Sequence, residues 1–377
     1  NVYGGLQDNG SWRGPAYSFV ERTLYDYLWR TVGGGDGFDT EPDPEDNTCG
    51  YGMSQGGNLY YFDAKTGISR NIVPTESDEE HRYNWNAGFA IDPFEPATIY
   101  LGSQFVHRSK DKGFTWEIIS PDLTTNDPEK QKQKESGGLT FDVTNAENHT
   151  TILCIAPSPV QKGVIWVGTD DGHVQVTKDS GKSWQLVSQK LTGTKNTKRS
   201  RVPYGTWVPH VEASWFDAGT AFVVFDDHRR SNWTTYVFVT RDFGKTWQSL
   251  STPDIDGFAH VIRQDRVDKD LLFVGTEFGL FTSLNGGKEW TKWTHGLPTA
   301  PVRDVAIHPR EHDLIIGTHG RAAYIIDDIS PLRDISEEVV KKKLHLFKTH
   351  DAYHIFRGRT GSYSSPGDAT FSGPNKQ

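Results

Sequence analysis

Five carboxylates in this chain of 377 residues follow strand-like segments and could take part in acid–base chemistry. They are Asp170, Asp171, Asp226, Asp227 and Glu277. Glycoside hydrolysis requires two carboxyl groups across a cleft, about 5 to 5.5 Å apart when the configuration is retained and about 6.5 to 9.5 Å apart when it is inverted. The sequence places no pair at either distance. The five are therefore catalytic candidates only if the protein is an enzyme, and the catalytic residues stay unknown.

A larger set of polar residues recurs at one position of successive sequence units, in the loops after Gly-Thr or Gly-Ser pairs and in their counterparts. If these loops converge on one face, the set forms a ligand-binding surface. The alternative is that each residue forms a turn or is simply solvated. The predicted binding residues are Gln7, Asp8, Asn9, Gln55, Gln104, Asp170, Asp171, Asp226, Asp227, His228, Glu277, His319 and Arg321.

The elements that must position these residues are marked by a repeated segment of eight residues. Residues 109–116 share a polar and aromatic pattern with residues 177–184, 240–247 and 283–290. The Asp or Asn oxygen is expected to accept hydrogen bonds from backbone amides about two residues further on. Gly supplies a positive φ, and Trp begins the next strand and covers the turn. The pattern predicts a strand-to-strand turn with a structural role, formed by Asp111, Gly113, Trp116, Asp179, Gly181, Trp184, Asp242, Gly244, Trp247, Asn285, Gly287 and Trp290.

The spacing of the repeats predicts an all-β fold. Each unit contains two strands, a Gly-Thr or Gly-Ser pair, a third strand, the repeated segment and a fourth strand, which is the pattern of one propeller blade. We predict a β-propeller of about seven visible four-stranded blades over residues 1–330, with a partial first blade. Two alternatives remain open: these blades form a complete ring, or they are part of a larger or double propeller. Residues 331–377 are predicted to form a short helix over 335–343, a strand at 345–347 and a linker or arm rich in Gly, Ser and Pro.

The repeated segment resembles the Asp-box (BNR) repeat of sialidases, xyloglucanases and the sortilin family. Further stretches at 3–11, 34–38, 54–59, 119–124 and 317–321 resemble bacterial sortilin-like BNR-repeat proteins. The resemblance covers residues 1–350 and implies a piece from the second half of a longer protein. The chain departs from the pattern where Asn285 replaces the box Asp and where Ala322 and Ala323 replace a Gly and a larger residue.

The resemblance favours a binding or assembly module over an enzyme. It implies an exported protein, secreted, periplasmic or at the cell surface, that holds a protein, peptide or glycan partner at a funnel on the top face of the propeller. The alternative is a glycoside hydrolase, xyloglucanase-like or sialidase-like. An Arg-Ile-Pro signature typical of sialidases is missing near the start. A third possibility is a structural subunit of a larger envelope assembly.

Composition limits the other classes of function. The formal net charge of −9 argues against a nucleic-acid binder. The sequence has no apolar run long enough to cross a bilayer. No cofactor or metal site is predicted, although the acidic residues within 36–46 could hold Ca²⁺ through their oxygens. Cys49 and Cys154 could form a disulfide or remain buried thiols.

Overall fold

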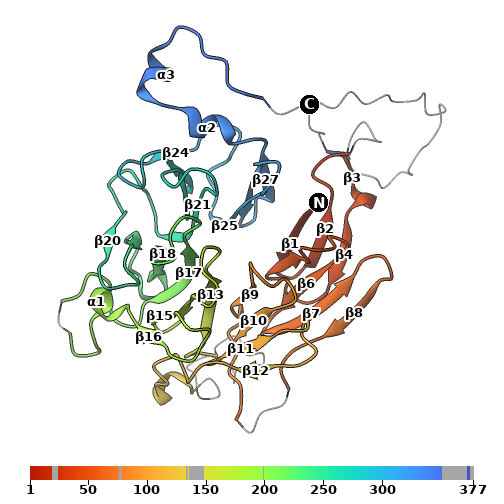
Figure 1. The fold of residues 1–377 in the computed structure, drawn as a ribbon, viewed down its shortest axis with the longest axis vertical. Coiled ribbons are helices and arrows are strands. Elements are labelled where there is room, and N and C mark those ends of the chain that lie inside the picture. Colours follow the sequence, from red (N-terminus) through yellow and green to blue (C-terminus); the bar gives the residue numbers. More distant parts are fainter. Residues whose placement is uncertain are drawn as a thin grey trace. The chain divides into compact units, whose positions relative to one another are not determined.

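The computed structural model describes residues 1–18, 24–75, 79–132, 135, 148–197, 199–349 and 372–373. The fold is all-β: seven antiparallel sheets, each a meander of sequential strands, make a β-propeller (Figure 1). Within the described residues five blades have four strands, and the first and the last have three. The predicted fold class, an all-β propeller of about seven blades, is confirmed.

The chain divides into two compact units. Unit 1 comprises Asn1–Ser54, Leu59–Asn71 and Asp334–Gln377. Its strands are β1 (Val2–Leu6), β2 (Gly10–Gly14) and β4 (Arg30–Gly33) in one blade, β5 (Thr40–Pro42), β6 (Cys49–Ser54), β7 (Asn58–Asp63) and β8 (Ile68–Asn71) in the next, and the short pair β3 (Leu24–Tyr25) and β28 (Ser372–Gly373). Its helices are a 3-10 turn at Asp26–Leu28 and α3 (Glu337–Lys341).

Unit 2, formed by Gln55–Asn58 and Ile72–Arg333, contains the other five blades. Their strands are β9 (Phe89–Ile91), β10 (Ile99–Gly102), β11 (Val106–Ser109) and β12 (Glu117–Ile118); β13 (Ile152–Pro157), β14 (Ile165–Thr169), β15 (Val174–Thr177) and β16 (Gln185–Leu186); β17 (Trp207–Ala213), β18 (Ala221–Asp226), β19 (Tyr236–Thr240) and β20 (Gln248–Ser249); β21 (Ala259–Gln264), β22 (Leu272–Thr276), β23 (Gly279–Ser283) and β24 (Thr291–Lys292); and β25 (Val302–Ile307), β26 (Leu314–Thr318) and β27 (Ala323–Ile326). Its helices are α1 (Gln189–Thr192), α2 (Ser330–Asp334) and 3-10 turns at Pro128–Lys130 and His228–Arg230.

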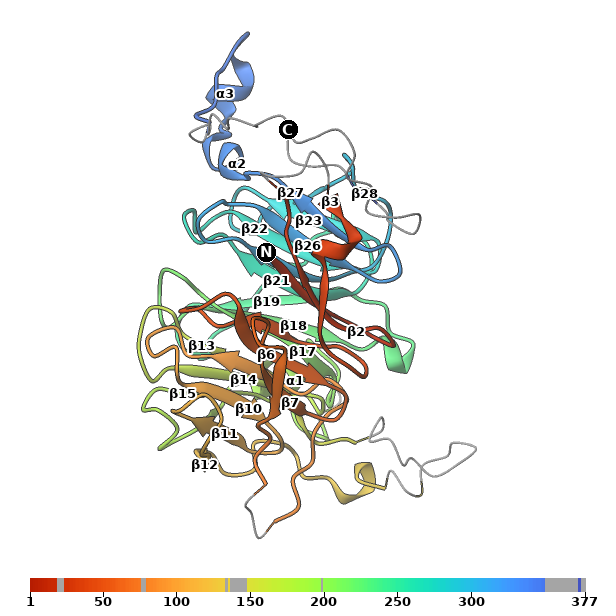
Figure 2. The ribbon, with the colours of Figure 1, turned by 90° about the vertical axis from the view of Figure 1, so that its right-hand side faces the viewer.

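The core of unit 2 lies between blades, as strand β18 illustrates. All six of its residues are buried, because successive side chains of a strand point to opposite faces and each face meets a neighbouring blade. Val223 and Phe225 pack in the cluster that contains Trp166, whereas Phe222 and Val224 pack in the cluster that contains Ile262. Burying each such side chain contributes about 1.5 to 3 kcal/mol. Figure 2 shows the blades of unit 2 succeeding one another from β10 and β11 through β17 and β18 to β21 and β22.

The repeated segments form the turns between the third and fourth strands of their blades. In the turn after β19, Asp242 accepts hydrogen bonds from the amide of Thr246 at 2.8 Å and from its hydroxyl at 2.6 Å. The hydroxyl of Thr240 accepts from the amide of Gly244 at 2.8 Å. The Asp side chain therefore binds the amide four residues further on, where the sequence analysis placed it about two residues on.

The tryptophan of each repeated segment also ties its blade to the one before. The indole N–H of Trp184 donates to the carbonyl of Ile119 at 2.9 Å, and that of Trp247 donates to the carbonyl of Val187 at 3.2 Å. Trp290 bonds in the same way to Leu250 at 3.0 Å. Each acceptor lies just after the fourth strand of the preceding blade, so one side chain closes the turn and joins two blades.

One local prediction is corrected. The strand predicted at 345–347 is wrong, because residues 344–349 lie in no strand or helix; Leu344 and Leu346 alternate as in a strand but are 77% and 83% exposed. The short helix predicted over 335–343 contains α3, and a second short helix, α2, precedes it. Of the two alternatives for Cys49 and Cys154, the structure has thiols without a disulfide between them. Most of the predicted C-terminal arm, residues 350–371 and 374–377, lies outside the described residues.

Candidate functional site

Blade topology brings polar residues of unit 2 to one edge. The first strand of a blade begins where the second strand ends: Trp207 pairs with Asp226, Ala259 with Thr276 and Val302 with Thr318. Residues at strand starts therefore meet residues in the loops after second strands. We call the resulting group the four-blade cluster, and its members are His149, Asp170, Trp207, Asp226, His228, Arg229, Phe258, His260, Glu277 and Arg303.

The pairing of the first two strands is irregular in each of these four blades. The register shifts between Ile152 and Cys154, Trp207 and His210, Ala259 and Val261, and Val302 and Asp304. Bulges of this kind re-aim side chains and are frequent beside functional sites. In the last two blades the residue at the shift is His260 or Arg303, so the irregular pairing sets the direction of two members of the cluster.

His260 lies between a carboxylate and a guanidinium. Its Nε2 is 3.2 Å from Oε2 of Glu277, and its Nδ1 is 3.3 Å from Nη1 of Arg303. Arginine only donates hydrogen bonds, so Nδ1 is the acceptor and the ring proton sits on Nε2, which donates to Glu277. Burial, followed by the charge of Arg303, lowers the pKa of His260 to about 3. The ring stays neutral near pH 7 and positions both neighbours.

An aromatic shelf adjoins this group, formed by Trp233, His228 and Phe258. The rings of His228 and Phe258 stack with centroids 4.7 Å apart and planes 19° apart, and Trp233 lies 6.4 Å from His228 with its plane 28° away. Nδ1 of His228 is 2.6 Å from Oδ1 of Asp226, which fixes the ring. Phe258 also contacts His260 edge-on at 4.9 Å. Trp233 is 61% exposed and presents an apolar surface to solvent.

Arg229 connects the shelf to the start of its own blade, at Trp207. Its guanidinium lies 3.7 Å from the ring centre of Trp207, a cation–π contact, and Nη1 is 3.8 Å from Oδ2 of Asp226. Trp207 in turn meets His149 edge-on at 5.7 Å. Burial, then the charge of Lys130, lowers the pKa of His149 to about 4. These contacts continue the cluster across a third and a fourth blade.

Asp170 and Asp171 are fully buried and serve the fold of the loops around them. Asp170 accepts from the amide and hydroxyl of Thr151 at 2.9 and 2.6 Å and from the amide of Asn84 at 3.1 Å. Asp171 accepts from the amide of Thr125 at 2.6 Å. Burial, and next the charge of Asp171, raise the pKa of Asp170 to about 7, against the hydrogen bonds from Thr151 and Asn84.

The other predicted binding residues lie outside the four-blade cluster. Gln104 is 2% exposed, and Asp227 is bound by Arg230 at 2.5 Å and by Asn232 at 2.8 Å, so both hold loops. His319 and Arg321 are exposed after β26, and Gln55 belongs to a short segment of unit 2. Gln7, Asp8 and Asn9 form the turn between β1 and β2 of unit 1.

The sequence analysis missed six members of the cluster, which are His149, Trp207, Arg229, Phe258, His260 and Arg303. It considered the loops after second strands, where Arg229 lies, but not the residues just before or at the start of the innermost strands, which lie directly opposite. A usable signal was the blade template itself, because residues just before or at the start of each first strand share one edge with the Gly-Thr loops. The bulges that orient His260 and Arg303 have no such signal.

The acidic stretch of unit 1 does not fit a calcium site. Asp46 accepts from the amide and hydroxyl of Thr48 and pairs with Lys65 at 3.0 Å. Asp43 accepts from the amide of Glu45 at 3.0 Å. In the part of the chain that the structure describes, no three His, Cys, Asp or Glu side chains come together to hold a metal ion.

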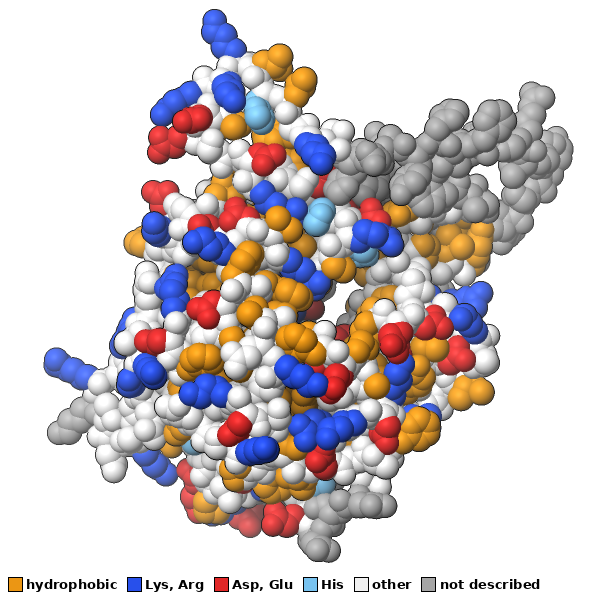
Figure 3. All heavy atoms as spheres, viewed as in Figure 1, with side chains coloured by type: hydrophobic (Ala, Val, Ile, Leu, Met, Phe, Trp, Pro, Cys, Tyr) orange, Lys and Arg blue, Asp and Glu red, His pale blue; other side chains and the backbone are white. Residues whose placement is uncertain are grey.

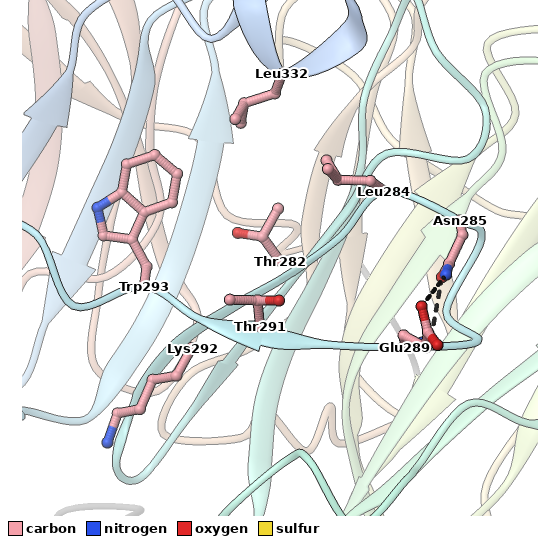
Figure 4. Close-up of a pocket in the computed structure, with 8 residues that line it drawn as sticks. All are labelled: Thr282, Leu284, Asn285, Glu289, Thr291, Lys292, Trp293 and Leu332. Carbon is pink, nitrogen blue, oxygen red and sulfur yellow. Dashed lines mark hydrogen bonds between the residues drawn. The ribbon is translucent and has the colours of Figure 1, made fainter. Parts of the chain in front are cut away.

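A separate hollow of about 270 Å³ lies at the outer edge of unit 2 (Figure 4). Its walls come from the β23–β24 hairpin and from Leu332 of α2. Asn285 accepts from the amide of Glu289 and donates to its carboxylate, both at 3.0 Å, which keeps this turn closed without the usual Asp. β24 is the outermost strand of its blade and β21 the innermost, so this hollow is not continuous with the four-blade cluster.

The charge on the surface is mixed. Basic and acidic side chains are interspersed on the face shown in Figure 3, in keeping with a net charge of −9 rather than a basic stripe. Among the described residues the structure has no helix that is long and apolar enough to span a membrane.

Comparison with known proteins supports the fold. No family model matches the chain. The oligoxyloglucan-reducing end-specific xyloglucanase of Emericella nidulans is 24% identical over 201 residues, 49% of this chain and 19% of that protein. The extracellular domain of the putative one component system BT4673 from B. thetaiotaomicron aligns with a TM-score of 0.52 and 12% identity, over 86% of this chain and 38% of that chain.

A second extracellular domain from the same species gives a similar result. The extracellular domain of the putative hybrid two component system BT3049 aligns with a TM-score of 0.51 and 11% identity, over 86% of this chain and 39% of that chain. Identities this low establish the propeller fold alone. The chain spans less than two fifths of the length of each of these three proteins.

Proposed function

We propose that this chain is an exported binding or assembly module that holds a protein, peptide or glycan partner at the four-blade cluster. The observation that carries the proposal is an unbroken series of side-chain contacts across four blades. It runs through His149, Trp207, Arg229, Asp226, His228, Phe258, His260 and Arg303. Aromatic and arginine side chains fixed in advance are the groups that dominate binding energy at interfaces. In this proposal the repeated turns are sortilin-like Asp-boxes that hold the blades and take no part in binding.

The state of the carboxylates favours a binding module over a hydrolase. Of the five catalytic candidates, Asp170, Asp171, Asp226 and Asp227 are buried and engaged in hydrogen bonds. Only the Glu277 side chain among these five has appreciable exposure, at 32%. A raised pKa such as that of Asp170 suits a general acid, but a fully buried carboxyl group does not reach a substrate. Two opposed, accessible carboxyl groups are needed for glycoside hydrolysis.

A glycoside hydrolase is the second candidate. It is favoured by the exposed carboxylate of Glu277 and by the likeness of half the chain to a xyloglucanase. Export is supported by the likeness to domains described as extracellular, and the site of action would be the envelope, the cell surface or the medium.

The test measures binding and turnover together. The full-length parent protein is applied to an array of polysaccharides and to proteins of its native envelope, and reducing sugar is assayed in parallel. We expect binding without sugar release, and about tenfold weaker binding by Arg229→Gln, since one charged hydrogen-bonding group typically contributes about 1.5 to 3 kcal/mol. Arg310→Gln, a change of an arginine whose side chain is 79% exposed at the turn between β25 and β26, is the matched control.

Two results would contradict the proposal. Sugar release that is lost on changing Glu277→Gln would make the protein a hydrolase. Binding that is equally strong in wild type, Arg229→Gln and Arg310→Gln would place the ligand elsewhere on the molecule.

A further inference from the structure

Arg303 is an exposed cation held in place by a neutral partner. It lies at the register shift of β25, and one N–H contacts Nδ1 of His260 at 3.3 Å. A guanidinium carries five N–H donors in a planar fork that matches a carboxylate. Among the described residues no carboxylate lies within ion-pair distance of Arg303, so the remaining donors are available to a ligand.

A second guanidinium lies near Arg303. After burial, the charge of Arg303 and then that of Arg229 lower the pKa of His260. Two nearby carboxylates already have partners within the protein. Asp226 is bound by His228 and lies 3.8 Å from Arg229. Glu277 accepts a hydrogen bond from Nε2 of His260. The open side of this group therefore favours an anion.

The aromatic shelf lies next to this cationic group. Phe258 contacts His260 on one side and Trp233 on the other, with ring centroids 4.9 and 5.7 Å apart. Trp233 and His228 give a flat surface that is partly open to solvent. A ligand that reaches from Trp233 to Arg303 thus meets first an apolar plane and then a fork of donors.

We propose that the four-blade cluster binds a sugar ring that carries a carboxylate, as in a uronic acid of an acidic polysaccharide. The carboxylate lies on Arg303 with Arg229 behind it, and the ring lies against Trp233. This inference rests on the proposed function and narrows its ligand. An acidic peptide fits less well, because a glutamate or aspartate side chain has no hydroxyl group beside its carboxylate and no ring to lie against Trp233. The hydroxyl groups of a uronic acid donate to Glu277 and accept from the arginines.

The test compares an acid with its ester. Oligomers of galacturonate and of glucuronate, their methyl esters, and poly-glutamate are titrated into the full chain by calorimetry at one fixed ionic strength. The ester keeps the ring and the hydroxyls but loses the charge. We expect an acid oligomer to bind at least about tenfold more tightly than its ester. Arg303→Gln should remove that preference, and Trp233→Ala should weaken acid and ester alike.

Arg310→Gln is the control, and thermal melts verify that each variant is folded. The inference is overturned if the ester binds as well as the acid, if poly-glutamate binds and neither uronic acid does, or if none of the probes binds. It is also overturned if Arg303→Gln and Trp233→Ala bind as wild type does. If a neutral glycan or a protein is the ligand and its binding depends on Arg229, this inference is contradicted but the proposed function still holds. Sugar release lost in Glu277→Gln would remove the proposed function itself.

Discussion

A histidine and a buried acid show how much the four-blade cluster depends on single residues. His260 is neutral because it is buried among cations, and this neutrality allows it to accept from Arg303 while it donates to Glu277. The pKa of Asp170 shifts in the opposite direction: burial, and next the charge of Asp171, raise it and favour the protonated form. Neither state is visible in the sequence, because both depend on which groups the blades bring together.

Asp170 gives a prediction about stability and pH. Its ordinary pKa of 3.8 is raised to about 7 in the folded chain. Between these values the folded state keeps a proton that the unfolded state has released, so this residue's contribution to the free energy of unfolding falls as the pH rises from about 4 to about 7. Asp170→Asn cannot titrate. We expect the stability of this variant relative to wild type to increase over that window.

The size of this effect follows from the pKa displacement, since one pH unit corresponds to about 1.4 kcal/mol. A gain of a few kcal/mol across the window is the upper limit. Urea denaturation of both proteins between pH 4 and pH 8 measures it. A difference that stays flat or falls with pH would show that Asp170 is already ionised at pH 4 in the folded chain.

At the scale of elements, the repeated turn is the feature that the sequence predicts best. Its Gly, its Asp or Asn and its Trp interact within a few residues or with the end of the adjacent blade, so a local pattern contains the information. The innermost strands are different. Their bulges depend on how β17, β21 and β25 pair with the next strand, and this pairing decides where His260 and Arg303 point.

The same distinction explains the error at the C-terminus. Residues 345–347 have strand-like alternation, but a strand requires a partner, and the described part of the chain pairs no strand with them. Gln104 and Asp227, both predicted to bind ligand, show a related limit of the sequence. It identifies them as loop residues but does not reveal that the Gln104 side chain bonds to the backbone of Glu80 and Arg82, or that Asp227 holds its own loop through Arg230 and Asn232.

The repeated turn carries a stability prediction. Asp242→Ala removes the acceptor of the Thr246 amide and hydroxyl, and loss of a comparable capping acceptor costs about 0.5 to 2 kcal/mol. Asp242→Asn keeps one oxygen, as Asn285 does in the turn after β23, so it should cost less. Thermal or urea denaturation ranks the variants. Equal losses for Ala and Asn would mean that the negative charge, rather than the acceptor geometry, stabilises the turn.

At the scale of the whole molecule, the repeat count predicted a propeller of about seven blades, and the structure has seven. The sequence could not reveal that blades four to seven place their strand starts and second-strand ends in one contact network, because that network joins residues more than 150 positions apart in the chain, from His149 to Arg303. Binding at this network is the central claim of the account, and it concerns unit 2 as a body rather than any one loop.

The most direct test is a hydrogen–deuterium exchange footprint of the full chain with the ligand recovered in the binding experiment. The account predicts that protection is concentrated at the starts of β13, β17, β21 and β25 and in residues 226–233, and that Arg229→Gln removes it. Unchanged exchange in the turns at residues 177–184 and 240–247 is expected alongside. Protection confined to those turns or to the hollow beside β24, with the four-blade cluster unaffected, would contradict the account.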